Sequence, residues 1–340
     1  MVEKNINLGH FIGHEQIVNY LTLSLAGHRF AHCYLLAGPA HSGKRTLAIR
    51  FSQALLCSTY IEGLSDSNIP CGQCDSCRHW QKNIHPDYFE LRLQEDKKMI
   101  GIDQVRQWQR SLANKSFLSK YKIGLISQAQ KLTVEAANAL LKIIEEPVGN
   151  TIIMVLADDL HLLLPTIISR SQLLKFSLVP SKSIAAGLID LGADQATASL
   201  IAGLACGLPG LAVNYLRHPQ ILAEYEQQLS DLLSILSASK HEQLAWIEKN
   251  IAHLDMTAAQ HRLDEFSNHL LLLFRAIYLQ QNALPQWHHL PGRQKQLNQL
   301  AHFFSEKKIM ALLDKLLVSQ AQRQFNLQPR LLAEDLLLSI

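Results

Sequence analysis

The chain has 340 residues, of which 48% are hydrophobic and 18% are charged, and its formal net charge is +3. This length suggests two or three domains, and the near-neutral charge gives no sign of a strongly basic nucleic-acid-binding surface. The most apolar runs are far shorter than the ~18 residues of a membrane span, and the first residues show no signal-peptide pattern. We therefore expect a cytoplasmic protein of several domains, without a membrane anchor.

The first half of the sequence alternates between helix and strand patterns. An apolar run at 33–37, an alternating pattern at 88–93 and the segments 121–126 and 151–157 predict four strands. Helical spacing is found at 17–25, at 47–56, from residue 102 onward and at 134–146. Residues 57–85 are rich in Gly, Ser, Asp and Asn and are predicted to be irregular. The alternation predicts a parallel sheet with helices on both faces.

The second half is predicted to be helical. The strand pattern ends near Leu178, and short helical patterns broken by glycines follow up to residue 216. Beyond residue 218 the helical patterns are long, with breaks at Pro285 and at Pro291-Gly292. The predicted fold class is α/β plus all-α. The predicted domains are an α/β domain over 1–178, a small helical domain over 179–217 and a C-terminal helical domain over 218–340.

The stretch from Gly38 to Thr46 has the pattern of a phosphate-binding loop between a strand and a helix. Gly38 and Gly43 would let backbone N–H groups point at an anion, and Lys44 would reach the β- and γ-phosphates. Arg45, however, stands where the pattern requires a Ser or Thr hydroxyl for Mg²⁺, and Thr46 comes one position late. The pattern predicts a degenerate nucleotide-binding loop. The alternative is a glycine turn that merely connects the strand to the helix.

Hydrolysis would also require acidic residues at the end of a later strand, to hold Mg²⁺ and to polarise water. The matching place after the third strand has Ser127 and Gln128, neither of which is a carboxylate. Asp158 and Asp159, after the fourth strand, are the nearest substitutes, although solvated loop residues are the more frequent explanation for such a pair. We expect no intrinsic ATPase activity and at most a residual affinity for ATP.

Four cysteines form a second constellation. Cys71, Cys74 and Cys77 are separated by two residues each, and Cys57 lies upstream. Four thiolates satisfy a tetrahedral Zn²⁺ ion, and two-residue gaps allow a tight turn to present successive sulfurs to it. Buried or redox-active thiols are the alternative, and His85 is a further candidate ligand. The spacing in a polar loop favours a structural zinc site made of the four cysteines.

An arginine in the segment 166–171 is the third candidate. Arg170 would lie at the edge of the nucleotide-binding domain, where a guanidinium group can stabilise the γ-phosphate of a neighbouring subunit in the transition state. The position alone is a weak indication, because surface arginines are usually solvated or ion-paired.

Taken in order, these motifs resemble those of the bacterial AAA+ clamp-loader subunits of DNA polymerase III, and within that family the delta-prime type. The motifs that carry the resemblance are residues 38–44, the four cysteines, His85-Pro86-Asp87-Tyr88, the run from Ala136 to Pro147, and Ser169-Arg170. The resemblance covers about residues 8–178 and continues more loosely through Gly207-Leu208-Pro209-Gly210.

The resemblance implies an AAA+ domain with a zinc-binding insertion, a helical lid and a collar domain that oligomerises. It implies a heteropentameric loader with the ATP-hydrolysing tau/gamma subunits and the delta subunit, which opens the sliding clamp and places it on primed DNA. In that assembly Arg170 would complete the adjacent ATP site as an arginine finger. The losses at Arg45, Ser127 and Gln128 fit the delta-prime type better than the tau/gamma type.

Two other hypotheses remain open. The chain could be an active tau/gamma-like ATPase that uses Lys44 with displaced acidic groups, but the lost metal-binding positions disfavour this. It could also be a zinc-dependent nucleic-acid-binding module. The near-neutral charge and the lack of tryptophans interleaved with basic residues disfavour that reading.

Overall fold

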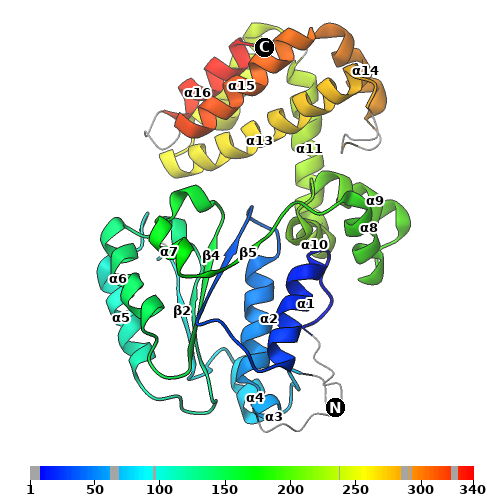
Figure 1. Ribbon diagram of the computed structural model, residues 1–340. Helices are drawn as coiled ribbons and strands as arrows, with labels where there is room; N and C mark the ends of the chain where they lie inside the picture. Colours follow the sequence, from blue (N-terminus) through cyan, green and yellow to red (C-terminus); the bar gives the residue numbers. More distant parts are fainter. Residues whose placement is uncertain are drawn as a thin grey trace. The chain divides into compact units, whose positions relative to one another are not determined.

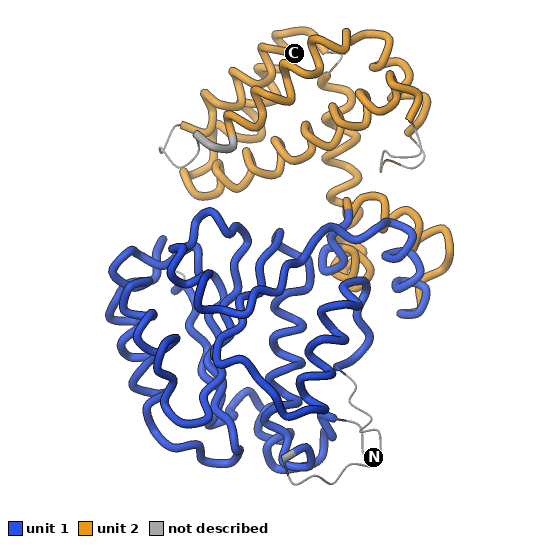
Figure 2. The backbone as a smooth tube through the Cα atoms, in the orientation of Figure 1, with its two compact units in different colours: residues 1–191, 207–211 blue, residues 192–206, 212–340 orange. Residues whose placement is uncertain are grey.

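A computed structural model describes residues 8–61, 69–94, 97–236, 238–284, 290, 293–322 and 328–340 (Figure 1). The chain forms two compact units, one made of 1–191 with 207–211 and the other of 192–206 with 212–340 (Figure 2). It therefore passes between the units three times. The expected domain limits at residues 178 and 217 remain predictions.

One parallel sheet organises the first unit. Its strands are β1 (Cys33–Ala37), β2 (Tyr88–Leu91), β3 (Lys122–Ile126), β4 (Thr151–Ala157) and β5 (Gln172–Lys175). They lie in the order β2-β3-β4-β1-β5, and every neighbouring pair is parallel. The strands β1, β3 and β4 are buried along their whole length, as expected when both faces of a sheet are covered.

Helices cover both faces of this sheet (Figure 1). One layer contains α1 (Glu15–Ala26) and α2 (Lys44–Leu56), and the other contains α5 (Ile102–Ala113), α6 (Val134–Glu145) and α7 (Pro165–Ser169). Strand β1 shows how the sequence serves both layers. Its residues Tyr34 and Leu36 join the core beneath α2, whereas Leu35 joins the core beneath α6.

Two expectations for this unit were wrong in detail. The stretch predicted to be irregular contains two short helices, α3 (Ser58–Ile61) and α4 (Asp75–Gln81). Helix α4 is too short for an apolar period to reveal it. Its N-cap is Cys74, whose sulfur accepts the N–H of Cys77. Strand β5 was not predicted, because three of its four residues are exposed at the sheet edge.

The first unit also includes α8 (Ser181–Asp190) and the short segment 207–211. A Cβ atom on Gly187 of α8 would lie 2.5 Å from Ile12, so the helix packs closely on the N-terminal lead-in. The segment 207–211 returns to the loop that follows β1. The N–H of Gly210 donates to the carbonyl of His41 over 2.8 Å.

Among the described residues, every regular element of the second unit is a helix, which confirms the all-α part of the expected fold class. Its helices are α9 (Gln195–Leu204), α11 (Pro219–Leu236), α12 (Lys240–Ile247), the π-helix Glu248–Ala252, α13 (Met256–Gln281), α14 (Gln294–Phe303), α15 (Glu306–Gln322) and α16 (Pro329–Leu338). Helix α10 (Pro209–Arg217) crosses from the first unit into the second. The expected breaks at Pro285 and Pro291-Gly292 lie outside the described residues.

The long helix α13 is central to the second unit and packs against α14, α15 and α16. Its side chains Leu263, Leu270 and Leu273 are almost fully buried. Among the described residues, no helix is both long and apolar enough to cross a bilayer.

Candidate functional site

The loop between β1 and α2 has the backbone geometry that its glycines predict. A Cβ atom on Gly38 would lie 2.2 Å from the carbonyl oxygen of Phe176, so no larger residue fits there. Gly43 precedes α2 with φ of +98°, a left-handed conformation that favours glycine. The structure thus brings Gly38, Gly43 and the first residue of α2, Lys44, into one strand–loop–helix unit.

The Lys44 ammonium group is already engaged by this chain. Its Nζ atom donates to the carbonyl oxygens of Gly38 over 2.5 Å and Pro39 over 2.6 Å. It also forms an ion pair of 2.9 Å with Asp158, which follows β4. The side chain of Lys44 is only 7% exposed. The cation that would hold a phosphate is therefore neutralised inside the loop.

Arg45 is engaged in the same way, at the position where the loop pattern requires a metal-binding hydroxyl. Its guanidinium forms an ion pair with the Glu90 carboxylate of β2 and donates to Ser127 Oγ over 2.8 Å. Arg92 and Ser127 also donate to Glu90. Burial raises the pKa of Glu90, but the hydrogen bonds from Arg45, Arg92 and Ser127 outweigh it and lower that pKa to about 2. Thr46 is exposed on α2.

Sequence reasoning missed Glu90. The pattern of hydrolysing enzymes places the carboxylate after β3, whereas Glu90 belongs to the neighbouring strand β2 and pairs in register with Leu125 of β3. Its place inside a strand pattern, next to apolar residues on both sides, was the available signal. Asp158, for which a solvated loop residue was the more frequent explanation, is indeed exposed at the end of β4, and it also pairs with Lys44 and accepts the side-chain N–H of Gln130 over 2.8 Å.

The four cysteines converge as predicted. The sulfurs of Cys57 and Cys74 lie 3.9 Å apart, those of Cys71 and Cys77 lie 3.9 Å apart, and all four lie within 4.8 Å of one another. Four ligands at the usual Zn–S distance of about 2.3 Å would have sulfurs about 3.8 Å apart. A hydrogen bond from Cys77 lowers the pKa of Cys57 to about 4 against the opposing effect of burial. The donor set and its spacing therefore fit a zinc ion.

His85 does not belong to this ligand set. Its Nε2 atom lies 2.6 Å from Ser76 Oγ, and its Nδ1 atom accepts the N–H of Asp87. Ser76 in turn donates to the carbonyl of Leu56, next to the first cysteine. Both ring nitrogens are thus used in joining α4 to the start of β2. Burial lowers the pKa of His85, which keeps the imidazole neutral in this role.

Arg170 follows α7, and its described contacts are with α6 and α7, not with the loop after β1. Its Nε atom forms an ion pair with Glu145, and Nη1 lies 3.5 Å from the carbonyl of Thr166. The side chain is 42% exposed. The backbone beside it is fixed, because Ser171 Oγ donates to the carbonyl of Ile167 over 2.7 Å. The predicted site residues therefore form three separate groups: loop, cysteine cluster and arginine.

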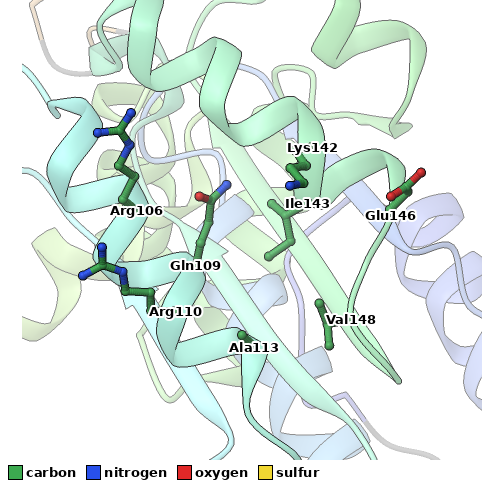
Figure 3. Close-up of a pocket in the computed structure, with 8 residues that line it drawn as sticks. All are labelled: Arg106, Gln109, Arg110, Ala113, Lys142, Ile143, Glu146 and Val148. Carbon is green, nitrogen blue, oxygen red and sulfur yellow. The ribbon is translucent and has the colours of Figure 1, made fainter.

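A groove between α5 and α6 was not predicted from the sequence. Figure 3 shows its lining, with Arg106 and Arg110 on α5, Lys142 and Ile143 on α6, and Glu146 just beyond α6. The cavity has a volume of about 340 Å³. Its lining is positively charged, because it has three cationic side chains and one carboxylate. The helical spacing of these residues is the sequence pattern from which the groove could have been predicted.

The family model described as "DNA polymerase III, delta subunit" matches residues 13–180. "DNA polymerase III subunit delta'" of Pseudomonas aeruginosa is 41% identical over 140 residues, which is 41% of each chain. The protein of the same name from Escherichia coli is 30% identical over 234 residues, or 66% of this chain and 68% of that one. A Bacillus subtilis "DNA polymerase III subunit tau" is 29% identical over 51% of this chain and 29% of its own length.

The chain spans only 41% to 55% of the length of the delta-prime relatives from Pseudomonas aeruginosa, Haemophilus influenzae and Bacillus subtilis. The match to the Escherichia coli protein extends over more than two thirds of that chain. The matched region contains the loop, the four cysteines and Arg170. Because the Escherichia coli protein is 30% identical over 68% of its length, the chain belongs to the DNA polymerase III subunit delta-prime family.

Proposed function

We propose that this chain is a non-hydrolysing clamp-loader subunit. It would act in the cytoplasm as a scaffold for the tau/gamma and delta subunits of DNA polymerase III in a heteropentamer. The complex would open the sliding clamp and place it on primed DNA. The observation that carries the proposal is that both cations of the loop are held by this chain's own carboxylates, Lys44 by Asp158 and Arg45 by Glu90.

This arrangement opposes nucleotide hydrolysis in two ways. A phosphate approaching Lys44 would have to displace Asp158, and the displaced carboxylate would repel it. Arg45 stands at the sequence position whose hydroxyl would bind Mg²⁺, and its positive charge would disfavour a second cation nearby. Ser127, after β3, can hydrogen-bond but cannot serve as a metal-binding carboxylate or as a base near neutral pH.

Arg170 would contribute to turnover in a neighbouring subunit. A guanidinium that is partly exposed and fixed at its backbone can reach the γ-phosphate of an adjacent site, where it would stabilise the charge of the transition state. Its separation from the chain's own loop supports a role in trans.

Zinc would have a structural role. Cys57, Cys71, Cys74 and Cys77 would hold it, and the ion would cross-link the end of α2 to the start of α4. Four thiolates leave no open position for a substrate, so the ion would stabilise the fold and take no part in a reaction.

The first prediction concerns a loader reconstituted with tau/gamma, delta, clamp and primed DNA. Arg170→Ala should slow ATP turnover and clamp loading severalfold, because one ATP site loses its finger. Lys44→Ala should change both rates by less than about twofold, because Lys44 is not used in hydrolysis. Steady-state ATPase and clamp-loading assays measure both effects.

Equilibrium binding of ATP to the isolated chain, with and without Mg²⁺, completes the test. We expect no binding that depends on Mg²⁺. If the isolated chain hydrolyses ATP and Lys44→Ala abolishes this activity, the active tau/gamma-like hypothesis is correct and our proposal is wrong.

A further inference from the structure

The ion pair between Glu145 and Arg170 joins the ends of two helices. Glu145 is the last residue of α6, and Arg170 follows the last residue of α7. A carboxylate oxygen of Glu145 contacts Nε of Arg170. The two side chains are 46% and 42% exposed, so the pair is accessible to a partner from solvent.

The backbone on both sides of this pair is held by one core. Ile144, next to Glu145, and Ile167, on α7, are fully buried in the same hydrophobic cluster. Ser171, next to Arg170, is tied to β1 because its Oγ atom lies 3.2 Å from the Cys33 sulfur. The relative positions of the two Cα atoms are therefore fixed, whereas the long arginine side chain would be free to rotate without a partner.

We infer that Glu145 is the positioning residue for Arg170: it holds Nε of the guanidinium, Nη1 lies 3.5 Å from the carbonyl of Thr166, and Nη2 remains to reach a phosphate of the neighbouring subunit. This inference rests on the proposed function of Arg170. An arginine side chain has large rotamer entropy, and a partner that orders it in advance lowers the cost of placing it in the transition state. Ion pairs as exposed as this one contribute little to folding stability, which leaves orientation as their main effect.

The test compares two adjacent glutamates in the reconstituted loader. Glu145→Gln removes the charge that holds Nε. Glu146→Gln is the matched control, because Glu146 lines the groove between α5 and α6 (Figure 3) and has no ion pair among the described residues. We expect Glu145→Gln to cause about half or more of the loss in kcat that Arg170→Ala causes, with KM for ATP unchanged. The control should leave kcat unchanged.

Two further variants separate positioning from general damage. Glu145→Asp keeps the charge and should retain more activity than Glu145→Gln. The double variant Arg170→Ala with Glu145→Gln should be no slower than Arg170→Ala alone, because Glu145 acts only through Arg170. Independent effects of the two substitutions would instead multiply the losses and would overturn the inference, as would an assembly defect of Glu145→Gln seen by gel filtration.

The outcomes also distinguish this inference from the proposed function. If Arg170→Ala has no effect, the finger itself is wrong and the inference is wrong with it. If Arg170→Ala slows the loader but Glu145→Gln leaves kcat unchanged, the inference alone is wrong. If Glu145→Gln raises kcat, Glu145 restrains Arg170 instead of positioning it, and the inference is again overturned.

Discussion

Glu90 is a buried carboxylate surrounded by donors. Its side chain is 7% exposed and accepts hydrogen bonds from Arg45, Arg92 and Ser127. A buried charge is tolerated only when it is paired and hydrogen-bonded, and removing one partner leaves the others unsatisfied. The cluster therefore fixes the first turn of α2 to the strands β2 and β3.

This cluster predicts a pH-dependent contribution to stability. The pKa of Glu90 falls from its ordinary value of 4.5 to about 2 in the folded chain. A lowered pKa stabilises the folded state at pH values above the ordinary pKa, by about 3 kcal/mol here, and this contribution is lost as the pH falls from about 4.5 toward 2. The free-energy difference between the wild type and Glu90→Gln, from urea unfolding, should be largest near pH 7 and shrink at pH 3.

Glu146→Gln serves as the control, because Glu146 is exposed and its removal should change stability little at either pH. A difference between wild type and Glu90→Gln that is the same at pH 7 and pH 3 would contradict the assignment of the lowered pKa to Glu90.

Residue-level prediction from the sequence succeeded where spacing alone fixes the geometry. The glycines of the loop and the cysteines at 71, 74 and 77 lie as their spacing indicates, because each group is close together in sequence, and Cys57 joins the three cysteines from the end of α2. Glu90 and the Lys44–Asp158 pair could not be predicted in the same way. Each depends on which strands are neighbours, and that order is set by the packing of the whole sheet.

At the scale of elements, the four cysteines lie between the end of α2 and helix α4. Helix α4 begins at Cys74, and the buried network of Ser76, His85 and the Leu56 carbonyl ties it to its surroundings. Two sulfurs of the cluster are buried and two are partly exposed. The four sulfurs therefore form a closed group within a region of little regular structure.

We predict about one zinc ion per chain, since the region offers one tetrahedral site. Elemental analysis of protein purified without chelator measures this directly. Cys74→Ser should lose the metal and lower the melting temperature, because it removes one of the four ligands, whereas a serine can still cap α4. Cys206→Ser, which changes a cysteine of the second unit, should keep the full zinc content. Wild-type protein without zinc would contradict the site.

Element prediction from the sequence was accurate for long periodic segments. The four predicted strands and the helices α1, α2, α5 and α6 are confirmed. Each of these helices repeats its apolar period over three turns, and the strands β1, β3 and β4 are apolar runs that are buried throughout. The short elements α3, α4 and β5 were missed. Their existence depends on a side-chain cap or on a position at the sheet edge, and neither leaves a period in the sequence.

At the scale of the whole molecule, the division into units does not follow the order of the sequence. Helix α8 and the segment 207–211 belong with the sheet, although α9 between them belongs to the other unit. The hydrogen bond from Gly210 to His41 connects this late segment to the loop after β1. The domain limits expected at residues 178 and 217 follow the order of the sequence and remain predictions.

A truncation series tests how much the sheet depends on these later residues. A fragment of residues 1–178 lacks α8 with its buried Ile184 and Leu188, and it exposes Ile12. We expect it to melt at least about 5 °C below a fragment of residues 1–217, because it loses several kcal/mol of stabilisation from buried apolar surface. A fragment of residues 1–191 should fall between them. Equal melting temperatures by circular dichroism would show that α8 and 207–211 do not support the sheet.

The Arg45 guanidinium has a consequence for how the subunit responds to its surroundings. A bound metal ion exchanges with solvent. The occupancy and the charge of a metal site therefore depend on the concentrations of the ion and the nucleotide. Arg45 is covalently part of α2 and keeps its charge at any physiological pH. The positive charge near β2 and β3 is therefore constant and does not depend on the concentrations of metal ion or nucleotide in the cell.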